Sequence, residues 1–78
     1  MKVKLKLFAT LRKHIEENDT GTCELDLTES TSVQEVLDLM KIPNNIPKII
    51  LINGMQKRAE DTLQNGDTLS VFPPIAGG

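Results

Sequence analysis

The side chains that most often carry chemistry in proteins are scarce in this sequence, which has one cysteine, Cys23, and one histidine, His14. Cys23 alternates with leucines, as a small buried apolar residue does more often than a reactive thiol. His14 stands at the edge of an expected short helix, where a surface role is more frequent than catalysis. These two residues do not make a structural zinc site. No Ser/His/Asp set or carboxylate pair has the spacing of a catalytic site, so we expect no metal and no independent active site.

The group left to carry chemistry is a main-chain carboxylate at the end of the sequence. The last six residues are Pro73, Pro74, Ile75, Ala76, Gly77 and Gly78. Prolines lack the N–H that a sheet ladder needs, so an extended tail is expected to follow the last strand. A Cβ at Gly77 would crowd the acyl carbon, whereas two bare glycines can enter a narrow channel. We expect a domain of residues 1–72 and a flexible tail of residues 73–78; an ordinary disordered terminus is the alternative.

A carboxylate of this kind needs activation before it can donate its acyl group, because it is ionised at neutral pH. Adenylation with ATP would convert the Gly78 carboxylate into a mixed anhydride with AMP as leaving group, open to a sulfur or amine nucleophile. The groups that stabilise phosphoryl chemistry are missing from the chain. We therefore expect no bound cofactor, with ATP and magnesium supplied through an activating partner.

The first elements that must position this end are two predicted strands. Residues 2–8 place three apolar side chains on one face and three lysines on the other, and residues 23–27 alternate in the same way. A short helix capped by Thr10, with Leu11 and Ile15 on one face, is expected between them. Strands joined by so short a segment are expected to be neighbours in one sheet.

The strongest helix signal lies in the middle of the chain. Apolar residues at i, i+3, i+4 and i+7 form one face of this helix, and they are Val33, Val36, Leu37 and Met40. Two pairs just before it have the spacing of a capping box, Thr31 with Gln34 and Ser32 with Glu35. We expect this helix to lay its apolar face across the sheet.

A hairpin and a closing strand complete the prediction. Residues 49–52 are typical of a strand, Asn53-Gly54 favours a two-residue turn, and residues 55–58 are the expected return strand. A second turn at residues 65–67 precedes the last strand, residues 68–72. This order predicts an α+β fold of the ubiquitin-like β-grasp type, with a mixed sheet and one main helix packed on one face. The last strand then lies beside the first in the middle of the sheet.

Composition excludes several other classes of protein. A chain of 78 residues makes one small domain, and its aromatic residues are only Phe8 and Phe72, which offer no platform for stacking nucleic-acid bases. The net charge of −2 also argues against nucleic acid as the main partner. The longest apolar run, residues 49–52, is far shorter than the roughly 20 residues that span a bilayer. Lysines interrupt the segment where a signal peptide would be apolar. We expect a cytoplasmic protein without membrane contact.

The sequence also carries a family resemblance. Residues 71–78, Val-Phe-Pro-Pro-Ile-Ala-Gly-Gly, resemble the C-terminal signature of the MoaD/ThiS family of ubiquitin-like sulfur carriers, and in particular of the small subunit of molybdopterin synthase. Residues 7–12, 52–54 and 65–67 resemble further family segments in register, so the likeness extends over most of the chain. Lys13 departs from the family pattern, in which an acidic residue is common at this point.

The resemblance implies that Gly78 is adenylated by a ubiquitin-activating-type adenylyltransferase and converted to a thiocarboxylate, with a sulfur donor such as a persulfide protein. The tail would then enter the large subunit of molybdopterin synthase and donate sulfur to a pterin precursor in molybdenum cofactor biosynthesis. Two alternatives stay open. The same carrier chemistry could serve thiamine thiazole or a thiolated tRNA base, or the chain could be a protein modifier joined to lysines through Gly78.

The end of the last strand is the expected partner-binding region. Alternation places Phe72 on the open sheet face, where an exposed aromatic ring is a docking anchor unless the tail or loops cover it. The residues expected to contact a partner are Phe72, Pro73, Pro74, Ile75 and Ala76.

Charged residues elsewhere allow two interpretations each. A basic patch for an acidic partner, or merely a solvated face, is formed by Lys2, Lys4, Lys6, Lys57 and Arg58. Arg12 pairs either with a partner's acid or with Glu16, four residues further along the expected helix.

Overall fold

The computed structural model of this chain describes residues 1–9, 11, 21–45 and 47–73, which contain one helix and five strands. In chain order these elements are β1 (Lys2–Leu7), β2 (Thr22–Asp26), α1 (Val33–Leu39), β3 (Ile49–Ile52), β4 (Met55–Gln56) and β5 (Thr68–Phe72). Of the short helix that Thr10 is expected to cap, only Leu11 is described, and it is buried; Thr10 and residues 12–20 lie outside the described residues. The division into a domain and a tail stays a prediction, since residues 74–78 also lie outside them.

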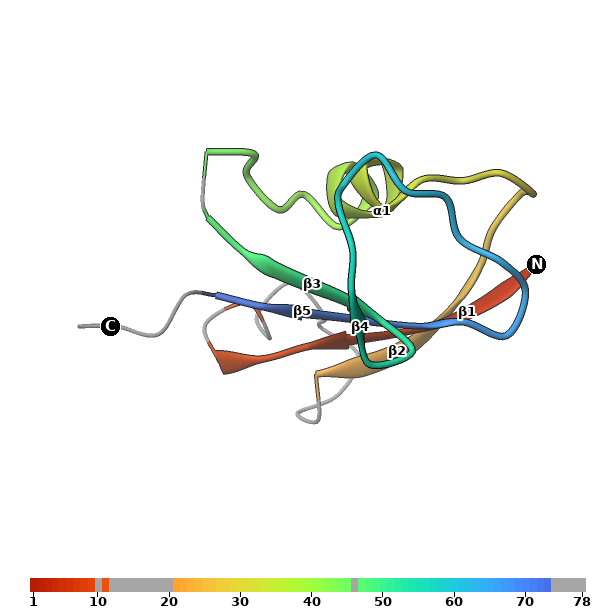
Figure 1. Cartoon of the computed structure of the whole chain (residues 1–78), viewed down its shortest axis with the longest axis horizontal. Coiled ribbons are helices and arrows are strands. Elements are labelled where there is room, and N and C mark those ends of the chain that lie inside the picture. Colours follow the sequence, from red (N-terminus) through yellow and green to blue (C-terminus); the bar gives the residue numbers. More distant parts are fainter. Residues whose placement is uncertain (10, 12–20, 46, 74–78) are drawn as a thin grey trace.

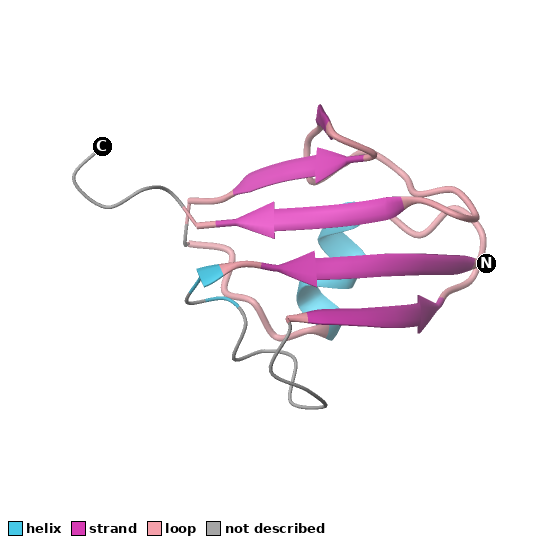
Figure 2. Cartoon of the chain, turned by 90° about the horizontal axis from the view of Figure 1, so that it is seen from below, coloured by secondary structure: helices cyan, strands magenta, loops and turns pink. Residues whose placement is uncertain are grey.

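The five strands form one sheet in the order β2-β1-β5-β3-β4. β1 and β5 are parallel, and the remaining neighbours are antiparallel. Figure 1 shows α1 above one face of this sheet, and Figure 2 shows the opposite, open face with the helix behind it. The predicted β-grasp arrangement, with the last strand beside the first, is therefore confirmed.

The core lies between α1 and the sheet. Side chains alternate across each strand, so one face of β1, β3 and β5 supplies apolar residues to the helix. The buried apolar residues of the described chain are Val3, Leu5, Leu7, Leu11, Val33, Val36, Leu37, Ile42, Ile50, Ile52, Leu63, Leu69 and Val71. Leu5 and Leu69 lie side by side on the two central strands and are fully buried, so the centre of the core is aliphatic.

Both ends of α1 are closed by hydrogen bonds. Of the two predicted capping boxes, the structure forms the one between Ser32 and Glu35, with Ser32 Oγ accepting from Glu35 N at 3.2 Å. At the other end, Ile42 N donates to Leu37 O at 2.9 Å, which is a Schellman closure. Lys41 occupies the position in this motif that usually carries glycine, with φ of 60°. Seven helical residues are thus stabilised mainly by their caps and their buried face.

The return strand is shorter than predicted. β4 ends at Gln56 rather than Arg58, although Lys57 N still donates to Ile50 O at 2.9 Å. Arg58 N instead donates a hydrogen bond to Asp61 Oδ2 at 2.7 Å, and Asp61 N donates to Arg58 O at 3.1 Å. Because this local turn uses the backbone groups of Arg58, the strand cannot continue through it.

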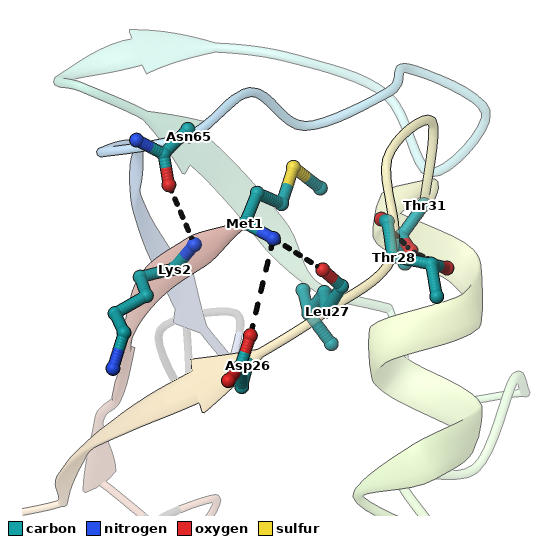
Figure 3. A network of polar contacts seen from close by, with 7 residues as sticks. All are labelled: Met1, Lys2, Asp26, Leu27, Thr28, Thr31 and Asn65. Atoms are coloured by element: carbon teal, nitrogen blue, oxygen red, sulfur yellow. Dashed lines mark hydrogen bonds and ion pairs between the residues drawn. The ribbon is translucent and has the colours of Figure 1, made fainter.

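Polar contacts join the start of β1 to its neighbours (Figure 3). The Met1 amino group donates to Leu27 O and lies 3.9 Å from Asp26 Oδ1. Lys2 N donates to Asn65 Oδ1 at 2.7 Å, which ties the strand to the turn before β5. This end of the central strand pair is therefore held from both sides.

Asn53 joins the β3–β4 turn to the start of β5. Its side-chain oxygen accepts from Thr68 N and its amide nitrogen donates to Asp67 Oδ1, both at 2.9 Å. The other oxygen of Asp67 accepts from Gln64 N at 2.8 Å. Asn53 also adopts a φ of 53°, which asparagine tolerates better than most residues. The residue predicted for its turn chemistry thus also makes a long-range contact.

This contact predicts that Asn53→Asp destabilises the fold, because the substitution replaces an N–H donor with an oxygen that faces the Asp67 carboxylate. We expect a loss of about 1 kcal/mol in the free energy of unfolding, measured by denaturant titration. Asn65→Asp is the matched control, since Asn65 uses only its oxygen, as an acceptor from Lys2 N, and aspartate keeps that acceptor. Equal stability of the two variants would contradict this role for Asn53.

Candidate functional site

The candidate site begins where β5 ends, because Pro73 follows Phe72 directly. β5 is paired with β1 over residues 68–71 and with β3 over residues 69–72. Val71 lies beside Leu7 of β1 and Phe72 lies beside Ile49 of β3. The ladder to β1 extends one residue further, since Phe8 N donates to Val71 O at 3.2 Å. The chain therefore leaves the sheet from a central strand that neighbours fix on both sides.

Phe72 lies on the open face, as its alternation with buried Leu69 and Val71 predicted. It is half-buried rather than fully exposed, because its ring stacks on that of Phe8. The ring centroids are 4.1 Å apart and the planes differ by 10°. Such stacked pairs contribute about 0.5–1.5 kcal/mol beyond the area they bury. The cover for Phe72 thus comes from the end of β1, and the stack joins the two central strands beside the origin of the tail.

Aliphatic side chains extend the aromatic pair into a patch. Ile49 lies directly beside Phe72 and is 41% exposed, while half-buried Leu51 lies beside Ser70. Both face away from α1, since Ile50 and Ile52 occupy the core side of β3. We call the group of Phe8, Ile49, Leu51 and Phe72 the open-face patch. A continuous apolar surface of this kind is typical of a protein-docking site.

The lysines of β1 are not equivalent. Lys2 lies directly beside Asp26, and Lys4 directly beside Glu24, so β2 supplies an opposite charge to each. Lys6 lies between Thr22 of β2 and Ser70 of β5. Register thus divides the predicted basic patch, matching two lysines with acids and leaving the third between hydroxyl side chains.

The other two cations of the predicted patch follow β4 at the far edge of the sheet. Arg58 Nη1 lies 3.6 Å from Glu60 Oε1, with both side chains largely exposed. Lys57 is exposed beside it. An exposed pair of this type adds little stability, so we assign it no structural role.

The remaining predicted site residues fall into two groups. Cys23 is half-buried and packs against the core, and Pro73 is half-buried at the end of β5. Outside the described residues lie Arg12, His14, Pro74, Ile75, Ala76, Gly77 and Gly78. In the described part of the chain, no three or more His, Cys, Asp or Glu side chains gather as metal ligands would. Nor does a helix of these residues have the length and apolar character needed to cross a bilayer.

A surface hollow of about 320 Å³ lies at the opposite end of β5 from the tail. Its lining includes Asn53, Asp61 and Asp67. These side chains already bind backbone groups or one another. The polar side chains that line the hollow therefore stabilise the turn before β5, and the hollow is separate from the open-face patch.

Comparison with known proteins gives a family and a fold. The sequence matches the ThiS family over residues 5–78. No curated protein matches it. Among solved structures, SAMP1 from Haloferax volcanii superimposes with a TM-score of 0.76 at 23% identity, covering all of both chains.

Two further solved structures carry names from molybdopterin biosynthesis. A putative molybdopterin converting factor subunit 1 from Pyrococcus furiosus is 25% identical, with a TM-score of 0.73 over 95% of this chain and 98% of that one. A complex of subunits 1 and 2 of the molybdopterin-converting factor from Helicobacter pylori contains a chain that is 18% identical, with a TM-score of 0.64 and full coverage of both chains.

Sequence reasoning missed Phe8 as a site residue. The signal was present, since Phe8 continues the alternation of Lys4 and Lys6 and therefore faces the open side. What sequence did not provide was the register that sets Leu7 beside Val71 and so brings Phe8 to Phe72.

The stack predicts a measurable coupling between the two rings. We expect the double-mutant cycle of Phe8→Leu and Phe72→Leu to give an interaction energy of about 1 kcal/mol in denaturant unfolding. The control cycle combines Phe72→Leu with Leu39→Ala, because Leu39 is exposed on α1, across the sheet from the stack. Its two effects should add. Additivity in the Phe8–Phe72 cycle as well would contradict the stack.

Proposed function

The chain belongs to the ThiS family, and on this basis we propose that it is a sulfur carrier. The terminal carboxylate of Gly78 is adenylated by a ubiquitin-activating-type enzyme and converted to a thiocarboxylate. The observation that carries the proposal is the extent of the family match, which runs to residue 78 and so includes the Gly-Gly end. Because the chain is small, its partners supply the nucleotide, the magnesium and the sulfur.

The chemistry proceeds by acyl activation. A carboxylate oxygen of Gly78 attacks the α-phosphorus of ATP, pyrophosphate leaves, and the acyl-adenylate forms. The terminal sulfur of a donor such as a persulfide protein then displaces AMP and forms an acyl disulfide with the chain. A thiol attacks the donor's cysteine sulfur, which forms a new disulfide with the donor and releases the Gly78 thiocarboxylate. Gly77 serves access, because a side chain next to the acyl carbon would obstruct the nucleophile. This chain contributes the reactive end and its presentation, and the activating enzyme contributes the groups that stabilise the phosphoryl transfer.

The central strand β5 determines where the tail leaves the domain and so how it is presented to a partner. β5 fixes the origin of the tail between β1 and β3, and the open-face patch lies at the same end of the sheet. A partner that docks on this patch holds the start of the tail at a fixed place on its own surface. A tether of only six residues, from Pro73 to Gly78, then keeps the carboxylate near one active site. We assign partner contacts to Phe72, Pro73, Pro74, Ile75 and Ala76 on this reasoning.

We further propose that the acceptor pathway is molybdenum cofactor biosynthesis, with this chain as the small subunit of molybdopterin synthase. The Phe-Pro-Pro start of the tail and the likeness to the Pyrococcus furiosus subunit 1 support this choice. The complex from Helicobacter pylori supports a second, large subunit as the partner. The reaction needs three partners, namely the activating enzyme, the sulfur donor and the synthase. A small carrier can bind each of them in turn.

The proposal predicts a specific mass change. After incubation with a ubiquitin-activating-type adenylyltransferase, ATP and a persulfide donor, intact-mass analysis should show one terminal oxygen replaced by sulfur. Deletion of Gly78 should abolish the change, whereas Leu39→Ala, at an exposed site on α1, should undergo it fully. An unmodified chain, under conditions that convert a known carrier, would overturn the proposal.

The same preparation distinguishes between the possible acceptors of the carrier's sulfur or acyl group. Binding to a large synthase subunit, weakened in Phe72→Ala, supports the molybdopterin assignment. A thiocarboxylate that fails to bind that subunit but sulfurates a thiazole precursor or a tRNA base assigns the carrier to those pathways. Slower-migrating conjugates that require Gly78 in cells identify a protein modifier instead.

A further inference from the structure

Two Asn-Gly pairs lie in exposed turns of the sheet. Asn53-Gly54 joins β3 to β4, and Asn65-Gly66 precedes β5. Asparagine followed by glycine is especially prone to spontaneous deamidation, because glycine has no side chain to hinder attack of its backbone nitrogen on the asparagine Cγ. Whether either pair reacts in the folded chain depends on the geometry of its turn.

The reaction needs only water and hydroxide, and no group is oxidised or reduced. Hydroxide removes the proton of the glycine N–H, and this nitrogen attacks the asparagine Cγ. A five-membered succinimide closes as the bond from Cγ to Nδ2 breaks, and Nδ2 leaves as ammonia after taking a proton from water. Water then opens the ring at one of its two carbonyl carbons and gives aspartate or isoaspartate. The ring closes at an asparagine ψ of about −120°, because Cβ then eclipses the glycine nitrogen.

The turn at Asn53 is one peptide rotation away from this geometry. The φ angles are 53° at Asn53 and 84° at Gly54, and Ile52 pairs with Met55, which defines a type I′ turn. Rotation of the peptide group between Asn53 and Gly54 gives a type II′ turn, whose first central residue has a ψ of about −120°. Among the described residues, neither Asn53 O nor Gly54 N makes a hydrogen bond, so the rotation breaks none. Because type II′ also fits a two-residue hairpin, β3 and β4 stay paired.

The remaining restraint on this site is the Asn53 carboxamide. Its oxygen accepts from Thr68 N and its nitrogen donates to Asp67 Oδ1, both at 2.9 Å. The carboxamide must leave these partners before Cγ meets the Gly54 nitrogen. Both bonds are exposed, so water replaces the lost partners at modest cost. Opening of the site is therefore a local event that leaves β3 and β5 in place.

The turn at Asn65 offers no such route. Asp67 N donates to Gln64 O at 3.1 Å, and φ is positive at Gly66 (88°) but not at Asn65, which defines a type II turn. The first central residue of this turn has a ψ of about +120°, and peptide rotation would give a type I turn with a ψ of about −30°. Neither angle brings Cβ into line with the glycine nitrogen. Lys2 of the central strand also holds both reacting groups, since Gly66 N donates to Lys2 O at 2.8 Å and Asn65 Oδ1 accepts from Lys2 N at 2.7 Å.

We propose that Asn53 is a site of spontaneous deamidation in the folded chain and that Asn65 is protected. Aspartate at position 53 places an oxygen, in place of the Nδ2 donor, against the Asp67 carboxylate. Isoaspartate adds a methylene to the backbone of the turn, which then no longer fits a two-residue hairpin. Either product loosens the start of β5, the strand that leads to the tail. This inference does not depend on the sulfur-carrier function.

The test measures the initial rate of conversion at each asparagine of the wild-type chain. The chain is incubated in mildly alkaline buffer, both folded and in denaturant, and peptide mapping by mass spectrometry detects exchange of the NH₂ group for OH. In denaturant the two Asn-Gly pairs should convert at comparable rates, because no turn restrains them. In the folded chain, conversion at Asn53 should be at least about 5-fold faster than at Asn65. The rate at Asn53 should rise with pH, since the attacking nitrogen must lose its proton.

Conversion that is faster at Asn53 only in the folded chain supports the inference. Equal rates at the two sites, or a faster rate at Asn65, overturn it. So does an Asn53 that stays intact while the denatured chain converts fully. Anion exchange isolates the chain deamidated at Asn53, which has one more negative charge and should show a lower free energy of unfolding than the unmodified chain. Unchanged stability would overturn the effect on β5.

Discussion

The parallel pairing of β1 with β5 is the constraint on which the rest of the structure depends. It joins the beginning and the end of the described chain at the centre of one sheet, with Leu5 beside Leu69 and Leu7 beside Val71. All four side chains are buried against the layer that contains α1. The same register sets Phe8 against Phe72 on the other face. A slip of one residue would exchange the two faces, so packing of the core and formation of the aromatic stack require the same alignment.

This alignment also organises the open face along its length. At the start of β1, Lys2 and Lys4 lie beside Asp26 and Glu24 of β2, whose carboxylates offset part of the positive charge of this surface. At the end of β1 and β5, the surface is apolar, with Lys6 at its edge. Under the proposed function, the chain must bind and then leave several partners, and a small apolar site suits this because it allows moderate affinity.

Much of the fold could be predicted because local signals agreed with one another. Alternation identified β1 and β2, the Ser32–Glu35 box marked the start of α1, and Asn53-Gly54 marked the hairpin. The early end of β4 was not predictable from propensity, since a side-chain contact of Asp61 with Arg58 N determines it. The Phe8–Phe72 stack depends on pairing between distant strands, which a single sequence does not specify. The prediction of a reactive end at Gly77 and Gly78 depends on residue types alone, and these two residues lie outside the described part of the chain.

The central claim is that this small domain presents a terminal carboxylate for activation by a partner. The most direct test is ATP–pyrophosphate exchange catalysed by a ubiquitin-activating-type adenylyltransferase, because exchange reports formation of the acyl-adenylate itself. The account predicts exchange that depends on this chain, disappears on removal of Gly78 and needs a higher concentration of Phe72→Ala for half-saturation. Exchange that persists without Gly78, or that the wild-type chain does not support, would contradict it.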